Sequence, residues 1–301
     1  MTSSWQQQTF ESCDQKLWQM LRLKLDEIVD TSINQEGLID NFYLPLFFKL
    51  HDQLTNSKQS AFVVGINAPQ GGGKTTLTSY LVQMFDWCDL KAVALSIDDF
   101  YLKREDQVRI AQEHRDNIYL QQRGYPGTHD IELGAETFSL LKNPKNTQTL
   151  SLPRYDKSKH LGQGDRADAE LWPNTQPPVD IILFEGWMLG FQALPSNQII
   201  DKHLLKINTL LEKYHKWHQF LDSFIYLYPE DVNYVVDWRI EAEERMKAKG
   251  LPGMTTEEVR EYAEKFLPAY RLYSPPLINN PPTVDNYINI EIGKNRLPII
   301  I

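Results

Sequence analysis

A run of three glycines followed by Lys74 and Thr75 forms a phosphate-binding pattern. These are the residues of the chain best suited to chemistry. The segment Ala68–Thr75 has the form [Ala/Gly]-x-x-x-x-Gly-Lys-[Ser/Thr] and lies between an apolar run and an apolar helix start; Ala68 supplies the small first residue. The glycines let backbone N–H groups face phosphate oxygens, Lys74 neutralises the β- and γ-phosphates, and Thr75 offers a hydroxyl to Mg²⁺. The alternative is a glycine-rich structural turn. The residues expected to bind the nucleotide are Gly71, Gly72, Gly73, Lys74, Thr75 and Thr76.

Acidic residues follow two other apolar runs. Asp98 and Asp99 come after the run 92–97, and Glu185 follows the run 181–184. A kinase needs a carboxylate that accepts the proton of the attacking hydroxyl, which contributes about 10²–10⁴-fold to the rate, and oxygen ligands around Mg²⁺. The alternative for Asp98 and Asp99 is that they cap the next element. The candidate metal ligands are Thr75, Asp98 and Glu185, the last through water.

The remaining apolar pattern predicts the scaffold that brings these strand ends together. Short continuous apolar runs, typical of buried parallel strands, alternate with helical segments after Ala61. This alternation predicts an α/β fold with a mostly parallel sheet, whose ligands bind at the carboxyl ends of the strands. Helical spacing at Gln15–Val29 and Phe42–Leu54, followed by a polar linker 55–60, predicts a helical N-terminal extension, residues 1–60, packed on the core. The expected strands are 62–66, 92–97, 181–184, 223–227 and 287–292.

Composition limits the possible classes of function. Among 301 residues, 31 Lys plus Arg against 40 Asp plus Glu give a net charge of −9, which disfavours a general nucleic-acid-binding protein because such proteins carry a basic face. No run approaches the roughly 18–20 apolar residues of a membrane span, and the N-terminus lacks the pattern of a signal peptide. The 2 cysteines, Cys13 and Cys88, cannot form a disulfide framework. We therefore expect a cytoplasmic protein without membrane or nucleic-acid partners.

The segments Ala68–Thr75, Asp98–Tyr101 and Phe184–Trp187 together resemble the phosphoribulokinase, uridine kinase and pantothenate kinase branch of P-loop kinases. Within this branch, the chain resembles the D-glycerate 3-kinase family of plants and cyanobacteria over about residues 35–295. Three further segments carry the narrower likeness. They are Arg-Gly-Tyr-Pro-Gly-Thr-His-Asp at 123–130, Pro-Arg-Tyr-Asp-Lys-Ser at 153–158 and Asp-Trp-Arg-Ile-Glu-Ala-Glu at 237–243.

The resemblance implies a P-loop kinase domain at 61–301, with a five-stranded parallel sheet, flanking helices and a mobile lid over about residues 230–270. It implies ATP and Mg²⁺ as cofactors and D-glycerate as the small-molecule substrate, converted to 3-phospho-D-glycerate. Asp98 matches the family's acid–base position, and Lys74 and Thr75 match its phosphate and metal positions. Arg239 lies where a lid arginine would reach the transferred phosphoryl group.

A glycerate kinase must hold a carboxylate and two hydroxyls, and carboxylates are bound best by Arg or Lys. His129 and Asp130 would contact hydroxyls, although Asp130 is equally suited to cap a helix that starts near Ile131. Tyr155 either closes the pocket or is an ordinary buried aromatic, and Lys157 is either a ligand or a solvated loop charge. The candidate carboxylate anchors are Arg123, Arg154, Lys157 and Arg166, and the other candidate contacts are Asp99, Tyr101, His129, Asp130 and Tyr155.

The charged segment Glu230–Lys249 predicts a helix on which Arg239 belongs to the lid and Arg245 to a solvated face. Gly250–Gly253 ends this helix, and Thr255 begins a second helix with a capping box. A helix-break-helix unit of this kind would close over ATP and exclude water, which prevents hydrolysis in place of transfer.

Two other classes of function stay open. One is a kinase for another small acceptor, such as a nucleoside, pantothenate or a sugar phosphate. The other is a nucleotide-dependent regulatory protein without an acceptor, which would need neither the paired acids nor the lid arginine. A GTPase is disfavoured because no Asn-Lys-x-Asp segment occurs, and His215 and His218 are expected to be surface histidines rather than metal ligands. The sequence leaves the oligomeric state open.

Overall fold

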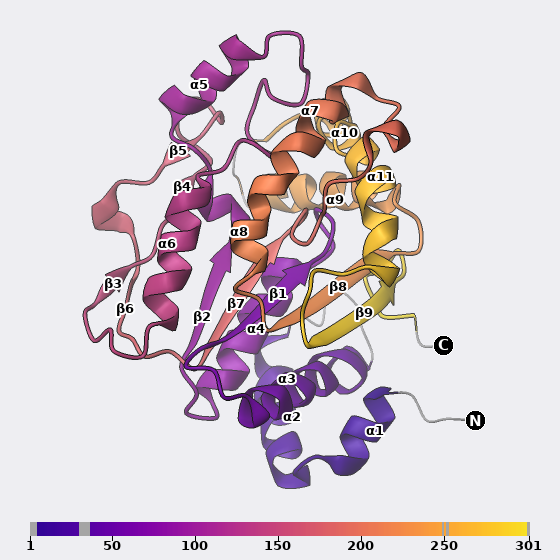
Figure 1. Ribbon diagram of the computed structural model, residues 1–301. Coiled ribbons are helices and arrows are strands. Elements are labelled where there is room, and N and C mark those ends of the chain that lie inside the picture. Colours follow the sequence, from indigo (N-terminus) through magenta and orange to yellow (C-terminus); the bar gives the residue numbers. More distant parts are fainter. Residues whose placement is uncertain (1–4, 30–36, 249, 251–252, 300–301) are drawn as a thin grey trace.

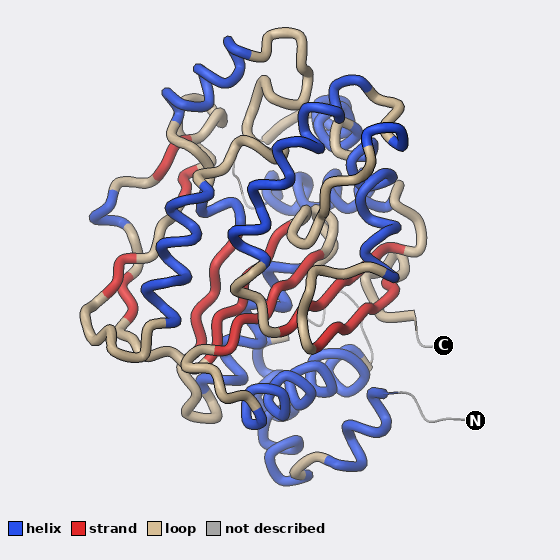
Figure 2. Tube along the Cα trace, viewed as in Figure 1, coloured by secondary structure: helices blue, strands red, loops and turns tan. Residues whose placement is uncertain are grey.

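A parallel five-stranded sheet forms the centre of the molecule (Figures 1 and 2), as the apolar runs and the family resemblance predict. A computed structural model describes residues 5–29, 37–248, 250 and 253–299. The strand order is β2-β7-β1-β8-β9, and every neighbouring pair is parallel. The strands are β1 (Phe62–Asn67), β2 (Ala92–Ser96), β7 (Ile181–Gly186), β8 (Ser223–Pro229) and β9 (Asn286–Ile292).

Helices cover both faces of this sheet, which is why its strands are apolar on both sides. Alternate residues of β1 show the division, because Val63 contributes to one buried cluster whereas Val64 and Ile66 contribute to the other. The cluster around Val63 includes side chains of α6 (Ile131–Lys142), α7 (Lys202–Leu211), α8 (His215–His218) and α11 (Leu267–Asn279). The opposite cluster includes side chains of α2 (Gln15–Ile28), α3 (Leu44–Asn56) and α4 (Lys74–Asp86).

The residues before β1 fold as helices in the described part of the chain. The predicted helix Phe42–Leu54 is found as a π-helical turn, η2 (Ile39–Tyr43), that continues into α3, and α3 extends into the predicted linker as far as Asn56. Trp18 and Phe47 pack in the same buried cluster as β1, so the extension rests on the sheet. The division of the chain into two units at residue 60 stays a prediction. The first helix of the chain is α1 (Trp5–Ser12).

The segment 150–175 departs from simple α/β alternation, because it contains two short antiparallel strand pairs. The pairs are β3 with β6 and β4 with β5. The loop 153–166 therefore includes a small hairpin. The elements of this region and its surroundings are η3 (Ile97–Phe100), α5 (Arg104–Glu113), β3 (Leu150–Ser151), β4 (Tyr155–Asp156), β5 (Asp165–Arg166), η4 (Ala169–Leu171), β6 (Asn174–Thr175), η5 (Ser196–Gln198) and η6 (Glu212–Tyr214).

The expected helix pair is present as α9 (Tyr234–Ala248) and α10 (Thr256–Glu264), and its action as a lid stays a prediction. Thr255 and Glu258 form the predicted capping box. The predicted break between the helices, Gly250–Gly253, lies partly outside the described residues, since Leu251 and Pro252 are not described. No helix of the described ranges is long and apolar enough to cross a membrane.

The expectation of a surface position is wrong for His218. Its side chain is buried, and its Nε2 accepts a hydrogen bond of 3.1 Å from the backbone N–H of Gly190. His215, at the start of the same short helix, is exposed as expected. The short spacing between the two histidines carried no information about the distant backbone group that His218 contacts.

Candidate active site

The site is assembled where three parallel strands end side by side. Asn67 at the end of β1 pairs with Gly186 of β7, and Glu185 pairs with Ser96 at the end of β2. The phosphate loop, the turn η3 that carries Asp98 and the Glu185 carboxylate therefore leave the same edge of the sheet. This arrangement is the one that the parallel-strand pattern predicts.

Two glycines of the phosphate loop adopt backbone conformations that favour glycine. Gly71 has φ +77° and Gly73 has φ +89°. A Cβ atom on Gly71 would lie 2.6 Å from Cβ of Trp238 on α9, whereas one on Gly73 would have no atom within 4 Å. Gly71 is thus required both by its conformation and by the closeness of α9, while Gly73 is required by conformation and leaves open space at the helix N-terminus for a ligand.

Lys74 and Thr75 lie at the first turn of α4. The Lys74 ammonium donates a hydrogen bond of 3.2 Å to the carbonyl oxygen of Pro69 within the loop. Burial lowers the pKa of Lys74, although the nearby carboxylates of Glu185 and Asp98 oppose this shift. Thr76 follows them with an exposed side chain on the same turn.

Thr75 and Glu185 face each other across the strand ends. The Thr75 hydroxyl donates a hydrogen bond of 3.2 Å to Oε1 of Glu185, and burial raises the pKa of this carboxyl, opposed by the charge of Lys74. In the part of the chain that the structure describes, no group of three or more His, Cys, Asp and Glu side chains is arranged to hold a metal ion. The hydroxyl and carboxylate oxygens are nevertheless the hard donors that suit Mg²⁺, which keeps several waters and is usually held jointly with phosphate oxygens.

Asp98 forms an ion pair with the loop 153–166. Its Oδ2 lies 2.6 Å from Nζ of Lys157. Burial raises the pKa of the Asp98 carboxyl, but the charge of Lys157 and hydrogen bonds from Lys157 and Tyr101 outweigh it and lower the pKa to about 2. Asp98 is therefore ionised at neutral pH.

Asp99 has a different role from its neighbour. Its carboxylate accepts a 2.9 Å hydrogen bond from the Ser96 backbone N–H and completes a capping box at the start of η3. Burial raises its pKa to about 6, although the guanidinium of Arg154, 3.3 Å away, opposes this shift. The capping alternative therefore holds for Asp99, and Arg154 is the cation that pairs with the cap.

His129 is buried against Tyr101, with the two rings stacked at a centroid distance of 4.4 Å. Its Nδ1 lies 2.7 Å from the hydroxyl of Tyr214, and that hydroxyl already accepts the N–H of Gly127. The tautomer that satisfies both groups has Tyr214 donating to Nδ1 and the proton on Nε2. His129 Nε2 is buried without a hydrogen-bond partner among the described residues, and burial lowers the pKa of the ring to about 3. A neutral ring thus offers one unused N–H.

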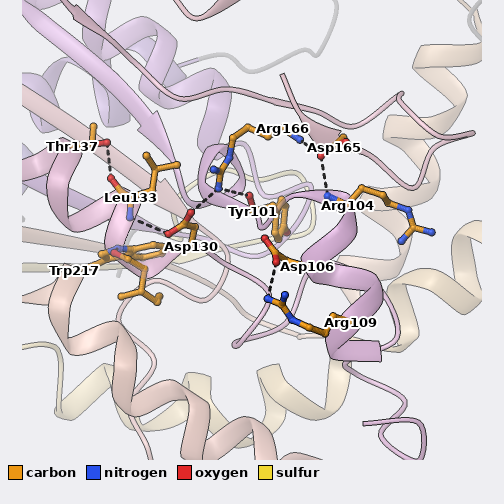
Figure 3. A network of polar contacts seen from close by, with 11 residues as sticks. Tyr101, Arg104, Asp106, Arg109, Asp130, Leu133, Thr137, Asp165, Arg166 and Trp217 are labelled. Atoms are coloured by element: carbon orange, nitrogen blue, oxygen red, sulfur yellow. Dashed lines mark hydrogen bonds and ion pairs between the residues drawn. The ribbon is translucent and has the colours of Figure 1, made fainter. Parts of the chain in front are cut away.

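Asp130 caps a helix, which is one of the two roles that the sequence left open, and it also pairs with Arg166. Its Oδ1 accepts the Leu133 N–H at 3.0 Å and caps α6, and its Oδ2 lies 2.8 Å from Nη2 of Arg166. Figure 3 shows Arg166 reaching from β5 to both Asp130 and the carbonyl oxygen of Tyr101, the latter at 3.4 Å. The Nε of Arg166 is buried and has no partner within the described ranges. The arginine therefore retains an unused donor beside the candidate substrate residues.

Arg123 and Tyr155 are joined by a ring contact. The Arg123 guanidinium lies 5.6 Å from the centroid of the Tyr155 ring, and it donates to the carbonyl oxygens of Gly162, at 2.9 Å, and Gln163. Tyr155 also packs edge-on against Tyr101 at 5.2 Å. Arg123 thus braces the loop, and Tyr155 connects it to the site.

Arg239 lies on α9 between two groups of the lid. Its Nη2 is 3.7 Å from Oε2 of buried Glu243, and its guanidinium is 5.7 Å from the ring of Tyr262 on α10. Its Nε is buried without a partner in the described part of the chain. Glu243 also accepts the Met254 N–H at 2.7 Å, which links the two lid helices.

Three residues around the phosphate loop were missed by sequence reasoning. The backbone N–H of Gln70 donates a 3.0 Å hydrogen bond to the hydroxyl of Tyr270, and Arg296 donates from Nε to the carbonyl oxygen of Gly71 at 2.7 Å. Trp238 packs on Gly71. Each lies more than 160 residues from the loop in sequence, and no local pattern connects it to phosphate binding.

A cavity of about 270 Å³ opens beside the loop. It is lined by Gly71–Leu77, by Phe42 and Tyr43 of the N-terminal extension, and by Arg245. Arg245 was expected on a solvated face; its side chain is exposed but also contributes to this cavity. The extension, expected to pack on the core, therefore also forms a wall beside the phosphate loop.

Comparison with protein families supports the arrangement just described. The model of the Phosphoribulokinase / Uridine kinase family matches residues 63–279. This range contains the phosphate loop, Asp98, Glu185 and Arg239, whereas Arg296 and the residues before β1 lie outside it.

Individual relatives extend the likeness over more of the chain. A protein of Arabidopsis thaliana named "D-glycerate 3-kinase, chloroplastic" is 37% identical over 300 residues, which cover 95% of this chain and 64% of that protein. The chain thus spans slightly less than two thirds of this relative. A "Probable ATP-dependent kinase" of Saccharomyces cerevisiae is 33% identical over 245 residues, covering 77% of this chain and 82% of that protein. The solved structure of a D-glycerate 3-kinase from Cryptococcus neoformans is similar with a TM-score of 0.77 and 29% identity, covering 86% of this chain and 97% of that one.

Proposed function

Because this chain belongs to the Phosphoribulokinase / Uridine kinase family, we propose that it transfers the γ-phosphoryl group of ATP to D-glycerate and produces 3-phospho-D-glycerate and ADP. The similarity to two proteins named D-glycerate 3-kinase supports the choice of acceptor. The observation that carries the proposal in this chain is the position of Asp98, whose carboxylate pairs with Lys157 of the loop 153–166 and lies close enough to Lys74 of the phosphate loop to affect its pKa.

The nucleotide is held by the phosphate loop. The N–H groups of Lys74, Thr75 and Thr76 begin α4 and lack intrahelical partners, so they suit phosphate oxygens together with the Lys74 ammonium. The oxygens of Thr75 and Glu185, with Asp98 nearby, fit Mg²⁺, which neutralises phosphate charge when it is bound. Arg239, whose Nε has no partner among the residues that the structure describes, approaches the transferred group from the lid.

Asp98 orients the hydroxyl that is phosphorylated. A carboxylate with a pKa of about 2 is a weak base. Phosphoryl transfer proceeds through a loose transition state in which the hydroxyl proton is lost late, so correct alignment matters more than base strength. Asp98 accepts the hydroxyl hydrogen in the ground state and takes the proton as the new P–O bond forms.

The carboxylate of glycerate is bound by Lys157 and Arg166. Lys157 is 58% exposed and forms an ion pair with Asp98, while the buried Nε of Arg166 has no partner among the described residues. Arg123 and Arg154 are less suitable, because Nη1 of Arg123 already holds two carbonyl oxygens of the loop and Nη1 of Arg154 already holds the Asp99 cap. The Nε2–H of His129 provides a donor for a substrate hydroxyl. A cytoplasmic location, expected from the cysteine content, is part of this proposal.

A panel of acceptors tests the proposal. ADP release by the purified chain with Mg²⁺–ATP is measured with D-glycerate, L-glycerate, uridine, pantothenate and ribulose 5-phosphate, and without acceptor. The proposal predicts release that depends on D-glycerate and exceeds every other arm. ADP release that depends on another acceptor would assign a different substrate to the enzyme. Equal ADP release with and without an acceptor would contradict the kinase assignment.

A further inference from the structure

The turn that follows β9 is fastened along one face of α9. Tyr234, Asp237, Trp238 and Glu241 lie at helical spacing, so they share one side of this helix. The Trp238 indole N–H donates a 2.7 Å hydrogen bond to the carbonyl oxygen of Lys294. The Lys294 ammonium lies 2.8 Å from Asp237, in an ion pair whose side chains are 62% and 43% exposed.

Arg296, on the same turn, is less exposed at 17% and has contacts in two directions. Its Nη2 lies 2.7 Å from Oε2 of Glu241, and its guanidinium is 5.3 Å from the Trp238 ring. Its Nε donates a 2.7 Å hydrogen bond to the carbonyl oxygen of Gly71 in the phosphate loop. One side chain therefore joins the loop to the helix that carries Arg239.

The contact fixes one particular peptide of the loop. The carbonyl of the Gly71–Gly72 peptide accepts from Arg296, and its N–H donates to the carbonyl oxygen of Pro69 at 3.0 Å. Both polar groups of this peptide are thus occupied within the protein. The turn that precedes Lys74 is held at a set angle, which aims the first N–H groups of α4 toward the phosphate site.

The backbone of Arg296 itself supports a positioning role. Its φ is +66°, a left-handed conformation that is rare for a long side chain and persists only where the surroundings enforce it. The turn is closed by hydrogen bonds from Gly293 N–H to the Leu297 carbonyl and from Arg296 N–H to the Gly293 carbonyl, at 2.9 Å and 2.8 Å. The unfavourable conformation directs the guanidinium between Gly71 and Glu241.

We propose that Arg296 is a positioning residue for phosphoryl transfer, which fixes the phosphate loop and α9 relative to each other and so places Arg239 over the nucleotide. The inference rests on the proposed function only in requiring that the loop hold ATP. It does not depend on which acceptor is used.

Two substitutions separate this role from a general effect on folding. Arg296→Lys keeps the positive charge but cannot contact Gly71 and Glu241 with one planar fork. Arg296→Gly removes the side chain and adopts the left-handed φ without strain. The matched control is Lys294→Ala, which removes a more exposed ion pair between the same turn and the same helix without a contact to the loop.

The readouts are the ATP dissociation constant from calorimetric titration, the thermal unfolding midpoint, and kcat and KM for whichever acceptor supports turnover. Because charge-assisted hydrogen bonds are among the stronger ones, both Arg296 variants should bind ATP at least about tenfold more weakly, with lower kcat and an acceptor KM within about twofold. Lys294→Ala should bind ATP within about twofold of the unaltered chain. Glu241→Gln should weaken binding less than Arg296→Gly and add little to it in the double variant, because the two groups act together.

Unchanged ATP affinity in both Arg296 variants would overturn the inference, as would an equal loss in Lys294→Ala. Normal ATP binding by the unaltered chain with turnover of a different acceptor would overturn only the proposed substrate. Failure of the unaltered chain to bind ATP would overturn the proposed function and this inference together.

Discussion

The ammonium of Lys157 lies 2.6 Å from the carboxylate of Asp98 and joins the loop 153–166 to the end of β2. The contact brings a cation to the group that is proposed to align the acceptor hydroxyl. A small substrate that carries both a hydroxyl and a carboxylate complements both members of this pair. In the proposed function, this pair therefore contributes both to the selection of the substrate and to the alignment of the hydroxyl that is phosphorylated.

Asp98→Asn should lower kcat by about 10²–10⁴-fold, because the variant cannot take the hydroxyl proton. ATP affinity should stay within about threefold, since the phosphate loop is unchanged. The measurement is a steady-state assay with an independent titration of ATP. Asp168→Asn is the matched control, because Asp168 pairs with Lys159 of the loop 153–166 at 3.0 Å, as Asp98 pairs with Lys157 of that loop. Substantial remaining activity in Asp98→Asn would reject the proposed role.

Lys157→Met should shift the acid limb of the kcat–pH profile to higher pH. Lys157 is the main cause that lowers the pKa of Asp98 to about 2, and without it burial raises that pKa. Activity requires the ionised carboxylate, so it is retained above the pKa and lost as the pH falls through it. We expect the limb to move by more than about one pH unit, measured at saturating acceptor. The same profile in Lys157→Met and Lys159→Met would contradict this expectation.

Gly71→Ala should be more destabilising than Gly73→Ala. Each substitution places alanine at a positive φ, which costs about 1–2 kcal/mol. Gly71→Ala also brings Cβ to 2.6 Å from Trp238, and such overpacking adds about 1–3 kcal/mol. Chemical denaturation of the two variants compares them directly. Equal free energies of unfolding would show that α9 moves away from the loop at no cost.

Burial of the His129 ring should lower the free energy of unfolding of the protein at acid pH. Burial lowers its pKa to about 3, while the unfolded chain titrates near ~6.5. The unfolded state binds more protons between these values, so the free energy of unfolding falls as the pH drops through this window, by roughly 2 kcal/mol between pH 7.5 and 5. His129→Gln should lose this dependence, relative to the exposed control His215→Gln. Parallel stability curves for the two variants would refute the assignment.

The sheet and the phosphate loop could be predicted because the sequence patterns that indicate them are local. The central strands are continuous apolar runs, β9 alternates apolar with polar residues, and the loop pattern Ala68–Thr75 is contiguous, so all of these can be recognised without knowledge of the rest of the fold. The capping role of Asp99 was open, because it depends on a 3₁₀ turn that the Asp-Asp pair alone does not specify.

The contributions of Arg296 and Tyr43 could not be predicted, because they depend on tertiary contacts. Arg296 is far from Gly71 in sequence and follows the last strand without a recognisable motif. Tyr43 lies in an extension that precedes the residues matched by the family model and that was expected only to pack on the core. Their positions follow from the order of the strands and from how η2 and α9 pack beside the loop.

The central claim is tested most directly by identifying the phosphorylated product. Phosphorus NMR of a reaction containing the purified chain, Mg²⁺–ATP and D-glycerate should show 3-phospho-D-glycerate appearing in step with ADP, and Asp98→Asn should give neither above background. A phosphoryl group on the 2-hydroxyl would contradict the proposed alignment of the substrate. Inorganic phosphate as the only new phosphorus species would contradict transfer to D-glycerate altogether.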